Sequence, residues 1–244
     1  MNLRKSIKSS DKWMYSFLRR IYFLIEEFSI PTPKLITRPL WIIVDNIRGA
    51  FYWILSTFWI TPLFKGSCHK VGKGFKAGTF LPFIEGRGKI SIGKRVLIFG
   101  KINFHFGSIA DEIPEVIIGD RCTIGHEVTL DISGKLVIGD HCLIASGVTI
   151  QDCSGHSLDA EERMANKPPD KRDIRNIKIG NNVWVGQFAY ILPGTVIGND
   201  CVIGAKAVVA RRIPENHLVY PAPYQKVKIR KIASMYSEKQ SNRS

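Results

Sequence analysis

Residues 179–210 read IGNNVWVGQFAYILPGTVIGNDCVIGAKAVVA, and a branched apolar residue returns in this stretch at every sixth position. We call these positions rungs; they are Ile179, Val185, Ile191, Ile197, Ile203 and Val209. Their spacing fits neither the period of an α-helix nor that of a single strand. It is typical of a solenoid in which short strands turn a corner every six residues.

The same spacing recurs upstream in three shorter sets of rungs. They are Ile92, Ile98 and Phe104, then Ile118, Ile124 and Leu130, then Ile138, Ile144 and Ile150. Three rungs make one triangular coil, and burial of each Ile or Val side chain is worth about 1.5–3 kcal/mol. Because one coil cannot shield its own apolar face, we expect the coils to be stabilised by stacking on one another.

Two further positions of the repeat have a predicted role. The residue four places after a rung is small and predicted to point inward, which makes buried apolar filler of Cys122, Cys142 and Cys201. The residues just after several rungs are predicted to form tight corners with positive φ. These pairs are Gly119-Asp120, Gly139-Asp140, Gly180-Asn181 and Asn199-Asp200.

The composition narrows the range of partners. The chain has 244 residues and a formal net charge of +14, which suits nucleic acid, an anionic membrane or a phosphorylated ligand. No zinc-finger spacing and no basic helix with heptads is present, so nucleic acid is not expected. The five cysteines form no CxxC pair, and free thiols fit a reducing cytoplasm. The sequence shows no signal-peptide pattern, which also favours a cytoplasmic location.

The chain divides into three predicted parts. Residues 1–66 form an N-terminal segment with an amphipathic helix over 13–27 and an aromatic-rich stretch over 40–64. Aromatic residues interleaved with Lys and Arg favour a helix that lies in a membrane interface, and the alternative is packing on the solenoid or on a sister subunit. Residues 67–215 form the solenoid and 216–244 a C-terminal extension. A second, shorter break in the rungs lies near 107–115.

A polar loop over 151–176 interrupts the solenoid and contains His156, within DCSGHSLD at 152–159. The rungs resume at 179–186 with IGNNVWVG. With its Gly-His before a polar loop and this second motif after it, the chain resembles the hexapeptide-repeat acyltransferases over about residues 67–227. Within them it is most similar to the acetyl-CoA-dependent O-acetyltransferases of sugars and polysaccharides. The resemblance implies an all-β fold, a left-handed parallel β-helix, that assembles as a homotrimer and needs no metal.

The resemblance also implies a catalytic role for His156. A neutral imidazole would take the proton of a sugar hydroxyl as it attacks the thioester, and would return it to the departing CoA thiolate. No acyl-enzyme is expected. A carboxylate would fix the imidazole tautomer, and the candidates are Asp131, Asp152 and Asp159.

Residue-by-residue matching to the family implies a CoA groove between neighbouring subunits. It places the pantetheine arm at Trp184, Gln187, Ala205 and Ala210, and the nucleotide phosphates near Lys206, Arg211 and Arg212. A solvated face is the alternative interpretation of the arginines. Several relatives carry an acceptor-contacting Asn where this chain has Gly125, followed by His126. Gly125 and His126 are therefore the candidate acceptor-binding residues, and the acceptor specificity of those relatives is not expected to carry over.

Three other functions are compatible with parts of this pattern. Gamma-type carbonic anhydrases share the fold but need zinc-binding histidines, two of them five residues apart, and no histidine pair in the solenoid has that spacing. A small-metabolite acetyltransferase, acting on serine or a free sugar, and a non-catalytic scaffold remain as alternatives. The favoured prediction is an O-acetyltransferase acting on a surface polysaccharide or its lipid-linked precursor at the cytoplasmic face of the membrane.

Overall fold

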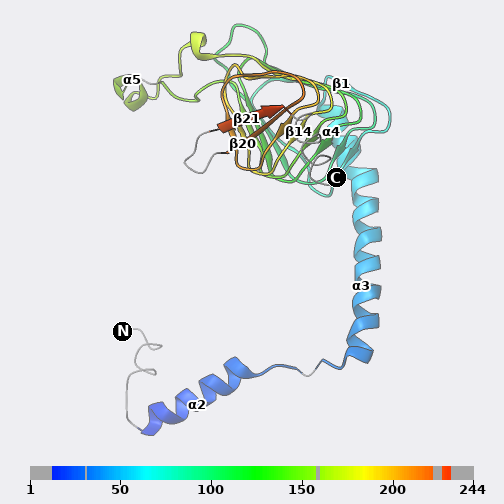
Figure 1. Cartoon of the computed structure of the whole chain (residues 1–244). Helices are drawn as coiled ribbons and strands as arrows, with labels where there is room; N and C mark the ends of the chain where they lie inside the picture. The colour runs from blue at the N-terminus through cyan, green and yellow to red at the C-terminus, as the bar shows by residue number, and fades with distance from the viewer. Residues whose placement is uncertain (1–12, 31, 158–159, 222–226, 232–244) are drawn as a thin grey trace, which may run out of the picture. The chain divides into compact units, whose positions relative to one another are not determined.

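The computed structural model describes residues 13–30, 32–157, 160–221 and 227–231. Short parallel strands wind into stacked coils with three flat sides, each side a sheet (Figure 1). The fold predicted from the sequence, a left-handed parallel β-helix with an N-terminal helical extension, is confirmed.

Each complete coil contributes one strand to each sheet. Sheet A contains, in spatial order, β1 (Lys70–Val71), β4 (Lys89–Ile92), β7 (Glu115–Ile118), β10 (Lys135–Ile138), β13 (Ile177–Ile179), β16 (Val196–Ile197) and β19 (Arg212–Ile213). Sheet B contains β2 (Lys76–Ala77), β5 (Leu97–Ile98), β8 (Thr123–Ile124), β11 (Leu143–Ile144), β14 (Trp184–Val185), β17 (Val202–Ile203), β20 (His217–Pro221) and β21 (Val227–Lys231). Sheet C contains β18 (Val208–Val209), β15 (Tyr190–Ile191), β12 (Thr149–Gln151), β9 (Val128–Ile132), β6 (Ile102–Phe106) and β3 (Phe83–Glu85). Strand β21 pairs antiparallel with β20 and ends sheet B.

The rungs form the core. Every predicted rung is buried, and the most exposed of them, Ile92, is only 3% exposed. The predicted small inward positions are also confirmed, because Cys122, Cys142 and Cys201 are at most 1% exposed. One continuous apolar cluster therefore runs through the stack of coils, as stacking of single coils requires.

The corners between sheets A and B differ in one respect from the prediction. Positive φ falls one residue later than expected, at Arg121, His141 and Asn182, and only Asp200 of the predicted pairs adopts it. The Asp or Asn before the turning residue uses its side chain instead. Asp120 Oδ1, for example, accepts a hydrogen bond from the backbone N–H of Lys94 in the preceding coil at 2.7 Å. Asp140, Asn181 and Asn199 repeat this bond from coil to coil.

Glycine precedes each of these Asp or Asn residues because neighbouring coils approach closely there. A methyl group at Gly119 would lie 2.6 Å from the backbone of Gly139 and 2.4 Å from the Asp140 carboxylate. We expect Gly119→Ala to lower the free energy of unfolding by at least about 1–3 kcal/mol, since the clash is with backbone and cannot relax by side-chain rotation. Urea denaturation of both proteins measures the loss. The control is Gly66→Ala, where an added methyl meets nothing within 4 Å; equal losses at both positions would contradict this interpretation.

Helices precede the first coil. They are α2 (Trp13–Glu27), α3 (Lys34–Leu55), the π-helix η1 (Ser56–Ile60) and α4 (Thr61–Ser67). The predicted helix over 13–27 is confirmed by α2. The chain separates into two compact units, Met1–Gly49 and Ala50–Ser244.

The end of this helical segment packs against the first coil. Ile60 and Phe64 are 5% and 1% exposed and belong to the core of the β-helix. The Phe64 ring lies 5.7 Å from the ring of Phe75, centroid to centroid. The hydroxyl of Thr61 accepts a hydrogen bond from the backbone N–H of Ala77 at 3.0 Å. Residues 56–67 therefore close the apolar end of the β-helix.

Candidate functional site

The predicted polar loop lies between two strands of different sheets. It leaves β12 after Gln151 and returns at β13, which begins at Ile177. It contains the short helices α5 (Ala160–Met164) and η2 (Lys171–Asp173), and α5 projects away from the coils (Figure 1). The two ends of the loop are joined at its base, where the Asp152 carbonyl accepts a hydrogen bond from the Arg175 N–H at 2.9 Å.

Asp152 lies at that base and is completely buried. Its two carboxylate oxygens accept hydrogen bonds from the backbone N–H groups of Ser133, at 2.8 Å, and Gly134, at 2.7 Å. Burial raises the pKa of Asp152, and these two amide hydrogen bonds oppose that shift. Both oxygens are thus occupied by the turn of the preceding coil. These two hydrogen bonds account for the buried carboxylate of Asp152 without any contact to His156. The role of Asp152 in orienting the imidazole of His156 therefore stays a prediction.

His156 occupies an exposed turn just above this base. Its backbone N–H donates to the Ser154 carbonyl at 2.8 Å, and its own carbonyl accepts from the Ser154 hydroxyl at 2.9 Å. Gly155, between them, adopts φ of 69°, a conformation that favours glycine. Within the described ranges, the imidazole has no hydrogen-bond partner. Asp159, the third candidate carboxylate, lies outside the described residues.

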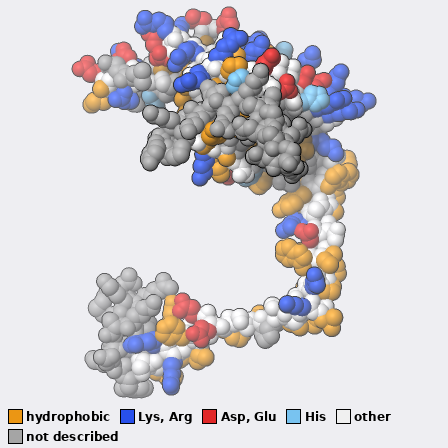
Figure 2. Space-filling view, in the orientation of Figure 1, with side chains coloured by type: hydrophobic (Ala, Val, Ile, Leu, Met, Phe, Trp, Pro, Cys, Tyr) orange, Lys and Arg blue, Asp and Glu red, His pale blue; other side chains and the backbone are white. Residues whose placement is uncertain are grey.

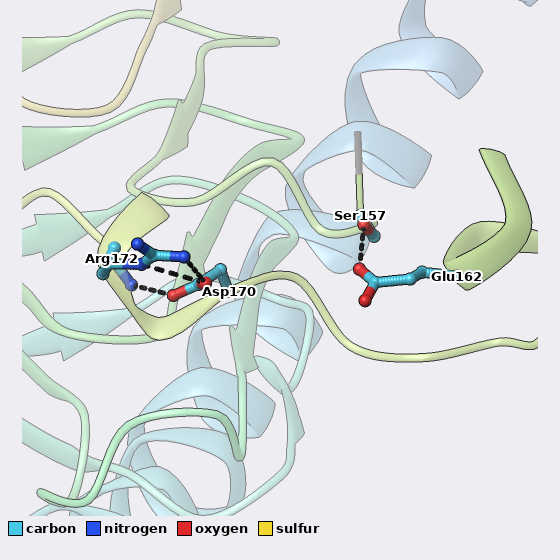
Figure 3. Close-up of polar contacts among 4 residues, drawn as sticks. All are labelled: Ser157, Glu162, Asp170 and Arg172. Atoms are coloured by element: carbon cyan, nitrogen blue, oxygen red, sulfur yellow. Dashed lines mark hydrogen bonds and ion pairs between the residues drawn. The ribbon is translucent and has the colours of Figure 1, made fainter. Parts of the chain in front are cut away.

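The remainder of the loop is braced by local polar contacts (Figure 3). Ser157 donates to the Glu162 carboxylate at 2.8 Å. The Asp170 carboxylate accepts from the backbone and the guanidinium of Arg172, and this interaction lowers the pKa of Asp170 to about 2. The exposed ion pair between Asp170 and Arg172 is worth little by itself. Each contact stabilises its own part of the loop, one at 157–162 and one at 170–172, and neither covers the exposed His156.

Asp131 lies on sheet C, directly opposite Gln151 in the strand pairing of β9 and β12. The prediction that it stacks one coil away from the loop base is therefore confirmed. Burial raises the pKa of Asp131, the nearby His105 lowers it, and Glu85 raises it. On the same face Gln151 accepts a hydrogen bond from the Tyr190 hydroxyl. His105 and Glu85 are thus charged neighbours of Asp131, and Asp131 in turn adds to the effect of burial in raising the pKa of Asp152.

The residues matched to a CoA groove lie at several places on the last coils. Trp184 is 51% exposed on β14, so its predicted outward direction is confirmed. Gln187 and Lys206 meet at one corner, where the Lys206 N–H donates to the Gln187 carbonyl at 2.8 Å. The others are exposed at turns or strand ends: Ala205, Ala210, Arg211 and Arg212.

Gly125 and His126 lie at the corner between sheets B and C. The backbone N–H of Gly125 donates to the Ile144 carbonyl at 2.7 Å. The His126 Nδ1 accepts a hydrogen bond from the Lys101 N–H at 3.0 Å, and its ring packs 5.5 Å from the Phe80 ring. His126 thus holds the corner of the preceding coil, and an acceptor contact there stays a prediction.

The part of the chain that the structure describes contains no cluster of three or more His, Cys, Asp or Glu residues able to hold a metal ion.

Two family models match the β-helix. Residues 176–211 match the bacterial transferase hexapeptide model, described as six repeats, and residues 115–152 match the hexapeptide repeat of succinyl-transferase. The two matched segments flank the loop that contains His156.

Curated relatives share the same region. One is WbbJ of Escherichia coli K12, a protein named as a candidate lipopolysaccharide biosynthesis O-acetyltransferase; it is 39% identical over 34% of this chain and 44% of its own length. Another is the galactoside O-acetyltransferase of Escherichia coli K12, 32% identical over 44% of this chain and 41% of its own length. The chain thus spans less than half the length of these two relatives.

A solved structure supports the fold over a longer stretch. The N-acyltransferase AntD from Bacillus cereus, in a complex with dTDP and coenzyme A, matches with a TM-score of 0.53 at 21% identity. The match covers 75% of this chain and 96% of that protein. At this identity the likeness concerns the fold alone.

Proposed function

We propose that this chain, whose residues 115–152 and 176–211 match models of hexapeptide-repeat transferases, transfers an acetyl group from acetyl-CoA to a sugar hydroxyl. The proposed acceptor is a surface polysaccharide, such as capsule, exopolysaccharide or lipopolysaccharide, or its lipid-linked precursor. The observation that carries this proposal is the exposed His156 on a loop whose base is fixed by the buried Asp152. The O-acetyltransferases named among the relatives support the choice of a hydroxyl acceptor.

The proposed chemistry needs one proton shuttle. A sugar hydroxyl attacks the thioester carbonyl while the neutral imidazole of His156 accepts its proton. The tetrahedral intermediate then collapses, the C–S bond breaks, and the imidazolium returns the proton to the CoA thiolate. A backbone N–H at a coil edge would stabilise the oxyanion. The imidazole of His156 suits this role, because the side chain is exposed and no described residue hydrogen-bonds to its ring nitrogens.

We further propose a homotrimer with CoA in the groove between subunits. Sheet B presents exposed apolar side chains on its outer face, with Leu143 43% and Trp184 51% exposed and paired in adjacent strands. Phe188, at the next corner, is 59% exposed. An apolar strip of this kind favours burial against a neighbouring subunit or the pantetheine arm. Lys206, Arg211 and Arg212 are the proposed partners of the nucleotide phosphates.

The activity is tested with acetyl-CoA that is labelled in its acetyl group. Incubation with the protein and a panel of sugars and oligosaccharides should give a labelled glycan. The label should be released by mild alkali, since esters hydrolyse there and amides do not. Label that resists alkali would identify an N-acyltransferase and contradict the proposed O-acetyl transfer.

The N-terminal helices support the proposed peripheral membrane association. None of the described helices is long and apolar enough to cross a bilayer. Yet α2 exposes Leu24 at 69% and Ile25 at 71%, and α3 has no buried residue. Hydrophobic side chains line α3 along its length (Figure 2). Exposed apolar and aromatic side chains with nearby Arg and Lys favour a helix that lies in the interface of an anionic membrane.

Deletion of residues 1–49 is expected to abolish sedimentation of the protein with vesicles that contain anionic lipid. This cut follows the boundary between the two compact units and keeps Ile60 and Phe64 in the core. Transfer to a water-soluble acceptor should persist. Met164→Ser, which removes an even more exposed apolar side chain from α5, is the control and should sediment like the wild type. Continued sedimentation of the truncated protein would overturn membrane association through this segment.

A free small sugar is the second candidate acceptor. It is favoured by the similarity to a galactoside O-acetyltransferase. The two acceptors differ in length. A KM that falls as the acceptor is lengthened would indicate a polysaccharide acceptor, and a KM that does not change with length would indicate a free sugar.

A further inference from the structure

The outer face of sheet C has a continuous row of polar side chains. Glu85, His105, Asp131 and Gln151 follow one another in register on strands β3, β6, β9 and β12. The Glu85 carboxylate accepts a hydrogen bond from Nδ1 of His105 at 2.7 Å. Since adjacent strands lie ~4.8 Å apart, the row extends over ~14 Å, which is longer than one sugar ring. We call these four residues the polar row.

The outward rows of the other two faces have a different composition. On sheet B, Leu97, Leu143 and Trp184 are apolar. On sheet A, Ile117 and Val137 interrupt one outward column, and the other column holds Lys89, Glu115 and Lys135, with an ion pair between Lys135 and Glu115. A second outward column on sheet C is also polar, with Asn103 and Thr129 joined by a hydrogen bond of 3.4 Å. Sheet C is therefore the face whose strands present polar side chains without a Lys or Arg.

The polar row ends at the candidate catalytic loop. Gln151 is its last member and accepts the Tyr190 hydroxyl. A methyl group built on Gly155 would lie 3.7 Å from Nε2 of Gln151, so the turn that carries His156 rests against the row. At the opposite end, Phe83 is 49% exposed and its ring lies 5.7 Å from the ring of His105. The row thus leads from an exposed aromatic side chain to the residue before His156.

The charge of this face selects among glycans. The six strands of sheet C contain no Lys or Arg, whereas Glu85 and Asp131 contribute carboxylates. On a chain with a formal net charge of +14 this is a locally acidic strip. It would repel uronic acids and phosphorylated sugars. Carboxylates, an amide and an imidazole match the hydroxyl groups of neutral sugars, because they offer both acceptors and donors.

We propose that the polar row binds an extended neutral glycan, with sugar units beyond the acetylated one lying along Glu85, His105 and Asp131. The proposal rests on the proposed function, because it assigns the acceptor of that same site. It names a polymeric, uncharged acceptor in preference to a free sugar.

Binding is measured first, without acetyl-CoA, on an array of bacterial repeat-unit oligosaccharides that includes neutral and uronate-containing members. The full-length protein should bind neutral oligosaccharides and not their uronate-containing counterparts. His105→Ala and Glu85→Ala should weaken that binding at least about tenfold. Lys178→Ala, which removes an exposed outward side chain of sheet A, should bind like the wild type. Equal binding by the wild type and the sheet C variants overturns the proposal, as does a wild type that binds no neutral oligosaccharide or prefers uronates.

Kinetics then separate a binding role from a structural one. With the bound oligosaccharide as acceptor, His105→Ala should raise KM about tenfold with little change in kcat. With only its terminal sugar as acceptor, the variant and the wild type should have equal kcat/KM. An equal loss with both acceptors would mean that the row supports the fold and does not bind glycan. If the protein binds the oligosaccharide but transfers no acetyl group to it, glycan binding by the polar row is supported and the proposed acetyltransferase function is contradicted.

Discussion

His156→Ala is expected to lower the rate of acetyl transfer by about 10²–10⁴-fold, the range that a positioned general base contributes. The loss should fall on kcat, because the imidazole acts when the acceptor hydroxyl attacks and not when CoA binds. The measurement is the initial rate of CoA thiol release at saturating acetyl-CoA and acceptor. The melting temperature should stay within about one degree, since His156 is exposed and its side chain has no hydrogen-bond partner among the described residues.

His141→Asn is the matched control for that variant. His141 is another exposed histidine, at a corner with φ of 60°, a conformation that Asn tolerates. The activity of the His141→Asn protein should equal that of the wild type. A His156→Ala protein that keeps full activity would remove the histidine from the mechanism and favour a scaffold.

Asp152→Ala is expected to lower the free energy of unfolding by about 2–6 kcal/mol. The substitution leaves the buried N–H groups of Ser133 and Gly134 without acceptors, at about 1–3 kcal/mol each. It also loosens the base of the loop, because the carboxylate no longer ties the loop to the turn at Ser133 and Gly134. Transfer should therefore slow even at temperatures where the protein remains folded. Chemical denaturation and rate measurements on the same preparation report both effects.

Asp152→Asn separates the two roles that Asp152 could have. The amide keeps one acceptor oxygen, so this variant should lie between the wild type and Asp152→Ala in stability. If Asp152 instead orients the imidazole, Asn should lose activity as fully as Ala while stability changes little. That result would contradict the role of Asp152 as the residue that holds the base of the loop.

Most of the fold could be predicted from the sequence because the coil places one branched residue in the core at every sixth position. The burial of the rungs, the inward cysteines and the position of the loop all follow from that period. The predicted position of positive φ at the corners was wrong by one residue. The Asp and Asn side chains hydrogen-bond to the preceding coil, and the residue after each of them adopts positive φ. Sequence patterns show which residues favour a turn but not which of two neighbours adopts its backbone conformation.

The site was predictable only in part. The position of His156 follows from a break in the rungs together with the flanking motifs. The position of Asp131 next to the loop base follows because it comes directly after the rung Leu130. The same rule would have found the polar row, because Glu85, His105 and Gln151 each follow a buried or half-buried residue of sheet C directly. It was missed because the residues lie 20 to 26 positions apart, and only the pairing register brings them together. The burial of Phe64 under the first coil likewise depends on packing and not on local pattern.

The proposed function is tested most directly by mass spectrometry of surface glycans. The glycans come from cells that make the wild-type chain and from cells in which His156→Ala replaces it. The account predicts alkali-labile acetyl esters on a sugar of the wild-type glycan and their absence from the glycan of the variant. The same pattern of acetyl esters in both would contradict it.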